Sequence, residues 1–151
     1  MTERRIHPLI RHAPDPDHPG WWTWDLPDDD RYNATIGKLL VRGEGEGRAR
    51  CRIFPTRRQS NLGESAHGGA ILTFIDMAMF AGGYAAGADI GPSVTLDLSA
   101  HFLSAARLGV SLDATVEVLR ESKRMASMRG LVEQEGEIVA SWTGTLRKLS
   151  S

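Results

Sequence analysis

Residues 68–86 read GGAILTFIDMAMFAGGYAA, an apolar run that contains a single charged residue, Asp76. Large apolar side chains are spread around the whole helical circumference of this run, so it predicts a helix that other parts of the fold must cover. A membrane span is the alternative for a run of this length. The central Asp76 and the lack of flanking basic anchors disfavour a span, and we expect a buried helix without membrane contact.

The segments on both sides of this run have the alternation and the turns of β-strands. Before it, residues 36–42 and 48–54 are predicted strands on either side of a glycine-rich turn. After it, short polar or glycine-bearing breaks separate four more predicted strands at residues 94–102, 110–119, 124–133 and 138–146. One apolar helix among antiparallel strands predicts an α+β domain, with the sheet wrapped around the helix.

The beginning of the chain differs in texture. Residues 13–30 read APDPDHPGWWTWDLPDDD, and their prolines exclude both helix interiors and central strands. We therefore predict an irregular N-terminal arm at residues 1–33 and one main domain at residues 34–151. The tryptophans at positions 21, 22 and 24 favour an arm that lies on the surface of the main domain.

The composition excludes several classes of protein. Among 151 residues, 18 basic and 19 acidic side chains give a net charge of −1, which argues against a general nucleic-acid binder. Cys51 is the single cysteine, so neither an internal disulfide nor a cysteine-rich zinc site is expected, and we predict no metal. The first residues lack the apolar run of a secretory signal, which favours a cytoplasmic protein.

Three other features receive structural interpretations. Cys51 alternates with apolar neighbours and is interpreted as a core residue. His101 is interpreted as a hydrogen-bonded core or interface residue. The row formed by Arg48, Arg50 and Arg52 is interpreted as a solvated face of a strand.

The loop before the predicted helix, residues 61–69, reads NLGESAHGG. The start of a helix presents unpaired N–H groups and a partial positive charge, and Gly68 and Gly69 allow a ligand oxygen to come close to them. This arrangement predicts an oxyanion hole for a carbonyl that gains negative charge. His67 is beside it as a donor or orienting group, and Asn61 offers an amide to position a water or a carbonyl.

Asp76 is the second candidate group. A carboxylate in an apolar helix is costly unless it is hydrogen-bonded, paired or exposed to a pocket. It is therefore either a satisfied structural residue or a general base that faces a ligand, and the residue type alone leaves both open. His67 and Asp76 are nine residues apart, about 13 Å along a helix, so one chain cannot bring both to the same substrate atom. If both are catalytic, the site requires a symmetric dimer.

The pattern Asn61-x5-His67-Gly68-Gly69-x6-Asp76 resembles the signature of PaaI-like hotdog-fold acyl-CoA thioesterases. Residues 93–105 (SVTLDLSAHFLSA) resemble the strand that follows the helix in that family, and residues 136–145 (GEIVASWTGT) resemble its closing hairpin. The resemblance extends over residues 36–146 and excludes the arm. It implies a hotdog fold, a dimer or a dimer of dimers with sites at the interface, and hydrolysis of an acyl-CoA thioester without cofactor or metal.

The resemblance also implies roles for individual residues. The Gly68 N–H would polarise the thioester carbonyl, and His67 would support that geometry. Asn61 would position water or the thioester. The partner's Asp76 would activate water or attack the thioester directly.

Further residues follow from the same resemblance. Thr95, with Ser93 as the alternative, would orient water from the strand after the helix. Gly69 would contact the substrate. Lys123 and Arg124 would bind the phosphates of coenzyme A, although solvated surface charges are the simpler interpretation of both.

Two other functions stay open at this point. Hotdog dehydratases and hydratases also pair a histidine with an acid across an interface, and they act on 3-hydroxyacyl or enoyl thioesters. A non-catalytic acyl-CoA-binding protein could keep the same fold. The tryptophans of the arm would either anchor it or cap an acyl tunnel, and the sequence does not define the acyl group.

Overall fold

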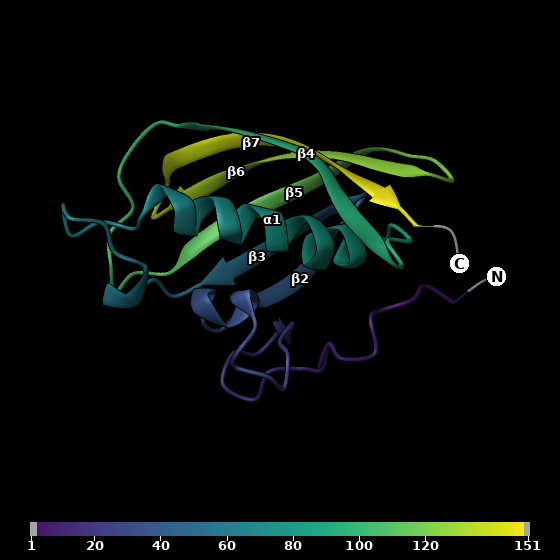
Figure 1. Cartoon of the computed structure of the whole chain (residues 1–151), viewed down its shortest axis with the longest axis horizontal. Helices are drawn as coiled ribbons and strands as arrows, with labels where there is room; N and C mark the ends of the chain where they lie inside the picture. Colours follow the sequence, from purple (N-terminus) through teal and green to yellow (C-terminus); the bar gives the residue numbers. More distant parts are fainter. Residues whose placement is uncertain (1–2, 150–151) are drawn as a thin grey trace.

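The computed structural model describes residues 3–149. Its elements follow in chain order: β1 (Trp22–Thr23), the 3-10 helix η1 (Tyr32–Ile36), β2 (Leu40–Gly45), β3 (Arg48–Ile53), the 3-10 helix η2 (Arg57–Gln59), α1 (Gly68–Ala85), β4 (Ser93–Phe102), β5 (Leu112–Glu121), β6 (Met125–Gln134) and β7 (Glu137–Lys148). All strand pairs are antiparallel, and they form one sheet in the order β1-β2-β3-β5-β6-β7-β4. The helix α1 lies across one face of this sheet (Figure 1).

Tight contacts hold α1 against the sheet. Phe74, Ile75 and Met79 are completely buried. A Cβ atom on Gly144 of β7 would stand 2.3 Å from the Met79 sulfur, so the strand can pass this close only because it carries glycine there. The prediction of an α+β hotdog fold, with an antiparallel sheet wrapped around one long apolar helix, is confirmed.

One face of α1 nevertheless stays uncovered within the chain. Leu72 is 36% exposed, and Thr73, Asp76 and Phe80 are half-buried on the same side of the helix. We call these four residues the open stripe. Two of its residues have partners on either side: Asp76 accepts a hydrogen bond from Thr95 of β4, and the Thr73 hydroxyl lies 3.1 Å from the Tyr32 hydroxyl of the N-terminal arm. By length and composition α1 could cross a membrane, but half of its residues are buried inside this fold.

The turn predicted in the glycine-rich segment before β3, residues 43–47, is shorter than predicted. Ile36 ends the 3-10 helix η1, and β2 runs from Leu40 to Gly45, so the strand predicted at residues 36–42 is shifted along the chain. Gly43 is part of this strand. A side chain would not fit at this position, because a Cβ there would stand 2.8 Å from the carbonyl oxygen of Ala85 at the end of α1. This glycine allows close packing, and the turn itself is confined to the two residues after Gly45.

The arm adds an edge to the sheet. Trp22 of β1 pairs with Val41 of β2. The buried indole of Trp21 packs against two guanidinium groups, those of Arg42 and Arg52, which lie 4.4 and 4.6 Å from the centre of the ring. Trp24 is also buried. These contacts anchor the arm. The 3-10 helix η1 spans the predicted boundary at residue 33, which remains a prediction.

The arginine row is less solvated than predicted. Arg50 donates to Glu133 at 2.6 Å and to Asp113 at 3.1 Å, and Arg52 donates to Asp113 at 2.6 Å. Their side chains are only 25% and 29% exposed. Acidic residues on the neighbouring strands explain the difference, because the strand order places them opposite the arginines.

Asp15 ties the arm to the main domain and makes its docking sensitive to pH. Its buried carboxylate accepts from Lys38 at 2.6 Å and from His18 at 2.6 Å. The hydrogen bond from Lys38, followed by that from His18, lowers the pKa of Asp15 below its ordinary range. A lowered folded-state pKa stabilises the fold at pH values above the unfolded-state pKa of about 3.9, and this stabilisation is lost as the pH falls through the folded-state value.

We expect the Asp15→Asn variant to have a lower Tm than the wild type at pH 7 and at pH 5. The difference should shrink as the pH is lowered from 5 to about 2.5, because the wild-type carboxyl takes up its proton as the pH falls through its lowered folded-state pKa. Thermal unfolding at the three pH values measures this. Equal Tm values at pH 5 would contradict the assigned role of Asp15, and Asp17→Asn is the matched control on an exposed neighbour.

Candidate active site

The start of α1 has one backbone donor that no other residue among 3–149 uses. His67 caps the helix, with its Nδ1 accepting from the Gly69 N–H at 2.8 Å. The N–H groups of Ala70 and Ile71 donate to the His67 carbonyl at 2.9 and 3.0 Å. Among residues 3–149, none accepts a hydrogen bond from the Gly68 N–H. The oxyanion hole predicted from two glycines therefore has one available amide, that of Gly68.

The cap also defines the state of the imidazole. Because Nδ1 accepts from a backbone N–H, the neutral ring carries its proton on Nε2, as assigned from this hydrogen bond. His67 is exposed, so this Nε2–H can act as a second donor beside Gly68. A Cβ on Gly69 would stand 3.1 Å from His67 Nδ1, so the glycine makes room for the ring. The Gly69 N–H already donates to His67 Nδ1, so it cannot supply the predicted contact with the substrate.

Phe102 borders the free amide and was missed from the sequence. A Cβ on Gly68 would stand 3.7 Å from the Phe102 ring, which is 49% exposed at the end of β4. The apolar ring beside the Gly68 amide displaces water. A hydrogen bond from this N–H to a ligand is therefore stronger than it would be in water. The only signal for Phe102 in the sequence is its place as an apolar residue within residues 93–105.

The side chain of Asn61 shapes the loop before the helix. Its Oδ1 accepts from the N–H groups of Gly63 at 2.8 Å and Ser65 at 3.0 Å. Its backbone N–H also donates to the Ser65 carbonyl at 2.8 Å. The amide oxygen is therefore engaged in the loop, and the amide nitrogen is the group left to position a ligand.

The structure brings Asp76 and Thr95 together. Thr95 on β4 donates from Oγ1 to Asp76 Oδ1 at 2.6 Å. Asp76 belongs to the open stripe, so its second oxygen remains available on an uncovered face of the helix. Ser93, the alternative to Thr95, donates its hydroxyl to the Ile90 carbonyl at 2.5 Å and so has a local structural partner.

The two halves of the candidate site do not meet within one chain. Gly68 and Asp76 are eight residues apart on one continuous helix, about 12 Å along its axis. A thioester carbonyl that accepts from the Gly68 N–H is therefore out of reach of the same chain's carboxylate.

Lys123 and Arg124 lie far from the start of the helix. They occupy the turn between β5 and β6, where the Arg124 carbonyl accepts from the Lys148 N–H at 2.7 Å. This turn is at the end of the molecule where α1 ends, opposite Gly68 (Figure 1). Within one protomer they are thus separated from the oxyanion donor by the length of the helix.

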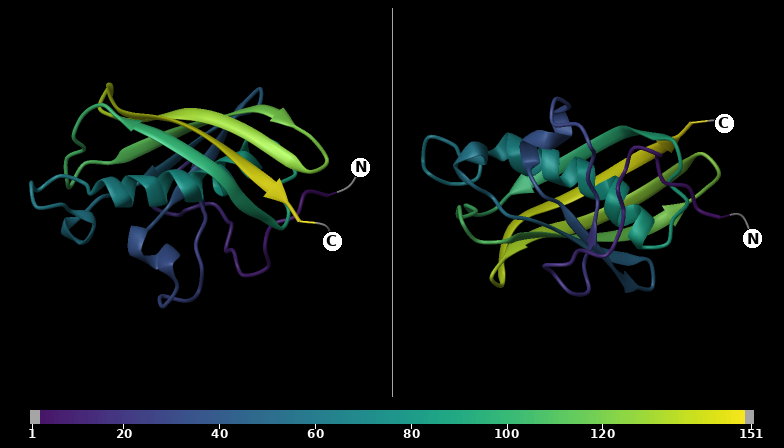
Figure 2. Two further views of the ribbon diagram at one scale, coloured as in Figure 1. Left: turned by 45° about the horizontal axis from the view of Figure 1, so that its top comes forward. Right: turned by 90° about the horizontal axis from the view of Figure 1, so that it is seen from below.

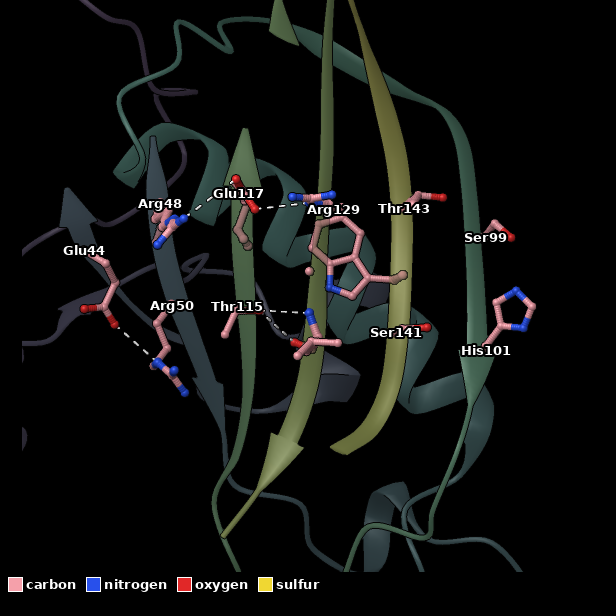
Figure 3. Close-up of a pocket in the computed structure, with 15 residues that line it drawn as sticks. Glu44, Arg48, Arg50, Ser99, His101, Thr115, Glu117, Arg129, Ser141 and Thr143 are labelled. Atoms are coloured by element: carbon pink, nitrogen blue, oxygen red, sulfur yellow. Dashed lines mark hydrogen bonds and ion pairs between the residues drawn. The ribbon is translucent and has the colours of Figure 1, made fainter. Parts of the chain in front are cut away.

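A large hollow on the sheet holds none of the predicted site residues. It measures about 860 Å³ and lies on the sheet face away from α1, between Arg48, Arg129 and His101 (Figure 3). Its charges are largely paired, since Glu117 accepts from Arg129 at 3.2 Å and lies 4.0 Å from Arg48. His101 is exposed here and is not a core residue as one interpretation had it. We assign no catalytic role to this hollow.

Two further groups are structural. Cys51 is completely buried, as predicted, and burial raises the pKa of its thiol. Within the part of the chain that the structure describes, no three His, Cys, Asp or Glu side chains are grouped so that they could hold a metal ion.

Comparisons with known proteins agree with this fold. The model of the thioesterase superfamily matches residues 63–141. Human acyl-coenzyme A thioesterase 13 is 25% identical over 99 residues, which are 63% of this chain and 67% of that protein. The match to the family model includes His67, Gly68, Asp76 and Thr95, and it leaves out Asn61 and the arm.

Solved structures show the same architecture. A mutant of the phenylacetic acid degradation protein PaaI from Thermus thermophilus is 28% identical, with a TM-score of 0.64 over 80% of this chain and 100% of that chain. A hypothetical thioesterase protein with coenzyme A from Streptococcus pneumoniae shares the fold at 21% identity, with a TM-score of 0.65 over 74% of this chain and 89% of that chain. Since the family model covers just over half of the 151 residues, the chain belongs to the thioesterase superfamily, as a PaaI-like thioester hydrolase with the hotdog fold.

Proposed function

We propose that the protein hydrolyses acyl-coenzyme A thioesters at a site shared by two protomers. The Gly68 N–H of one protomer and the partner's Asp76 act on the same thioester. The relative named acyl-coenzyme A thioesterase 13 supports this substrate class, and the S. pneumoniae protein of the same fold was solved with coenzyme A.

The position of the two groups along β4 carries this proposal. Gly68 lies near Phe102 at one end of the strand, since a Cβ on this glycine would stand 3.7 Å from the ring, and Asp76 is hydrogen-bonded to Thr95 near the other end. If two copies of β4 pair antiparallel about a two-fold axis, the Phe102 end of one lies beside the Thr95 end of the other. The same pairing that joins the sheets therefore brings the Gly68 amide towards the partner's carboxylate.

The edge strand itself supports such pairing. β4 is the last strand of the sheet and pairs with β7 alone among the described strands. Val94 and Leu96 on it are 45% and 52% exposed. A long apolar edge with unpaired backbone groups is a liability in a monomer, and a second copy of the same edge covers it.

The chemistry needs only these groups and water. Thr95 holds Asp76 Oδ1, and the other oxygen takes a proton from water as the water oxygen bonds to the thioester carbon. The carbonyl oxygen becomes an oxyanion that the partner's Gly68 N–H stabilises, with His67 Nε2–H as a neighbouring donor. Collapse breaks the carbon–sulfur bond, and the leaving thiolate takes the proton from Asp76.

A thiol-release assay over short, medium, long and aryl-acetyl coenzyme A esters tests the proposed function. We expect release of coenzyme A with equimolar free acid. An absorbance change at the enoyl group without thiol release would contradict it in favour of a hydratase, and tight coenzyme A binding without any release would contradict it in favour of a binding protein. A single turnover in H₂¹⁸O should label the acid product. Label in the Asp76 carboxyl would show that this residue is the nucleophile.

The Leu96→Asp variant should dissociate the dimer and lose activity. Leu96 is 52% exposed within the chain, so a charge there leaves the core intact but places two carboxylates at the paired edge. Analytical ultracentrifugation and the thiol-release assay measure both effects. Leu119→Asp is the matched control, because Leu119 is also exposed, 50%, and lies at a register shift of β5, a strand that does not pair with β4. A dimeric, active Leu96→Asp variant would contradict pairing through β4.

A further inference from the structure

A second hollow lies where the N-terminal arm begins. It measures about 380 Å³, and residues 3–8 line it together with Gly91 and Pro92. Its lining combines three basic residues, Arg4, Arg5 and His7, and one acidic residue, Glu3, with apolar ones. A concave site with these two kinds of lining is suited to a ligand that has both a planar ring and negative charge.

Arg4 is held by the end of the helix, and Arg5 lies near the loop that follows it. The Arg4 guanidinium lies 4.5 Å from the centre of the Tyr84 ring and donates to the Tyr84 carbonyl. The Arg5 guanidinium is beside Gly91, where a Cβ would stand 3.4 Å from Arg5 Nη2. Within residues 3–149, neither arginine has a carboxylate at ion-pair distance. The hydrogen bond to the Tyr84 carbonyl uses one of the five N–H donors of the Arg4 guanidinium, so most of these donors remain for a ligand.

Other cations gather at the same end. Pro92 accepts from the Leu149 N–H at 2.8 Å, and the neighbouring Lys148 N–H donates to the Arg124 carbonyl at 2.7 Å. The turn that carries Lys123 and Arg124 is therefore linked through the last strand to the wall of this hollow. Figure 2 shows the described start of the arm, from residue 3 on, the β5–β6 turn and the C-terminal strand β7 at one end of the molecule.

The distance from the candidate site matches the length of coenzyme A. Tyr84, on which Arg4 lies, is eight residues after Asp76, about 12 Å along the helix axis. The pantetheine arm between sulfur and the first phosphate has the length of about four extended residues, roughly 14 Å. Phe80 of the open stripe is half-buried and lies between Asp76 and Tyr84 on the helix.

We propose that this hollow binds the nucleotide end of coenzyme A, an inference that rests on the proposed function. Arg4 and Arg5 contact the phosphates through their planar forks, and the adenine lies on the apolar lining around Ile6 and Pro92. The arm, which lies outside the residues matched by the family model, is thereby part of the substrate-binding site. Lys123 and Arg124 add positive potential at its rim.

The test compares two substrates with the same acyl group. One is the acyl-CoA ester that the wild type hydrolyses fastest, and the other is its N-acetylcysteamine thioester, which has neither phosphate nor adenine. In the Arg4→Gln/Arg5→Gln variant, we expect KM for acyl-CoA to rise about tenfold, as for loss of charged hydrogen bonds. The kcat for acyl-CoA and the kcat/KM for the short thioester should not change, and the salt dependence of KM should become flatter.

The matched control is Arg11→Gln/Arg107→Gln, which removes the same charge from two exposed arginines that are outside both sites. It should leave KM for acyl-CoA unchanged. Equal effects of the Arg4/Arg5 variant on both substrates, or no effect on acyl-CoA, would overturn the inference.

Binding decides the inference independently of hydrolysis. Calorimetric titration with adenosine 3′,5′-bisphosphate should show binding to the wild type that is lost in the Arg4→Gln/Arg5→Gln variant. If the wild type hydrolyses neither thioester, the proposed function fails, and this titration still tests the hollow. Absence of binding to the wild type, or equal binding to both proteins, would overturn it.

Discussion

The Asp76→Asn variant is expected to lose at least about 100-fold in kcat on every acyl-CoA that the wild type hydrolyses, as for removal of a general base. The amide keeps the shape of the carboxylate, and its oxygen can still accept from Thr95, so the open stripe keeps its geometry. The amide cannot take a proton from water. The loss should therefore appear in kcat, with little change in KM or in Tm.

Thiol release under saturating substrate measures this loss. Asp97→Asn is the matched control, because Asp97 is an exposed aspartate of the same strand that holds Thr95. Its turnover should equal that of the wild type. An Asp76→Asn protein with near-wild-type kcat on all substrates would show that the carboxylate is only structural.

The Gly68→Pro variant should lose about 10²- to 10³-fold in kcat, as for removal of one oxyanion-hole donor. Proline has no backbone N–H, and the first position of a helix tolerates it well. The residue before it, His67, has φ −63° and ψ 138°, the extended conformation that a following proline requires. The substitution therefore removes the free donor while leaving the helix start in place.

The Gly68→Ala variant distinguishes loss of the N–H donor from the effect of adding a side chain at this position. Alanine keeps the N–H, and its Cβ would meet the Phe102 ring at 3.7 Å, an ordinary contact. This variant should retain most of the wild-type kcat, and circular dichroism should show unchanged helix content in both variants. Wild-type turnover by a folded Gly68→Pro protein would remove the backbone amide from the mechanism.

The sequence predicted those helices and strands in which the apolar residues recur with one clear spacing. The apolar run at residues 68–86 and the alternating strands after it were predicted within a few residues of their ends, because burial on the sheet selects these patterns directly. The glycines before β3 misled the prediction. Gly43 serves the approach of a strand to the end of α1, and a single sequence does not distinguish that use of glycine from a turn.

The sequence identified several residues of the candidate site, but it did not predict how they contact one another. The sequence pointed to Asp76 and Thr95, which the structure joins by a hydrogen bond. It did not show that Gly69 is already bonded to His67, since the direction of a cap depends on a side-chain rotamer. It also did not show the arm beside the open stripe, because that position depends on contacts between residues far apart in the chain.

Mixing two inactive variants tests the shared site most directly. Asp76→Asn keeps the amide, and Gly68→Pro keeps the carboxylate, so a mixed dimer contains one site with both groups and one with neither. After unfolding and refolding together in equal amounts, random pairing should restore about a quarter of the wild-type sites, with a KM equal to that of the wild type. If both groups serve a site within one chain, the mixture will show no more activity than the sum of the two separate variants, and the assignment of Gly68 and Asp76 to different protomers is wrong.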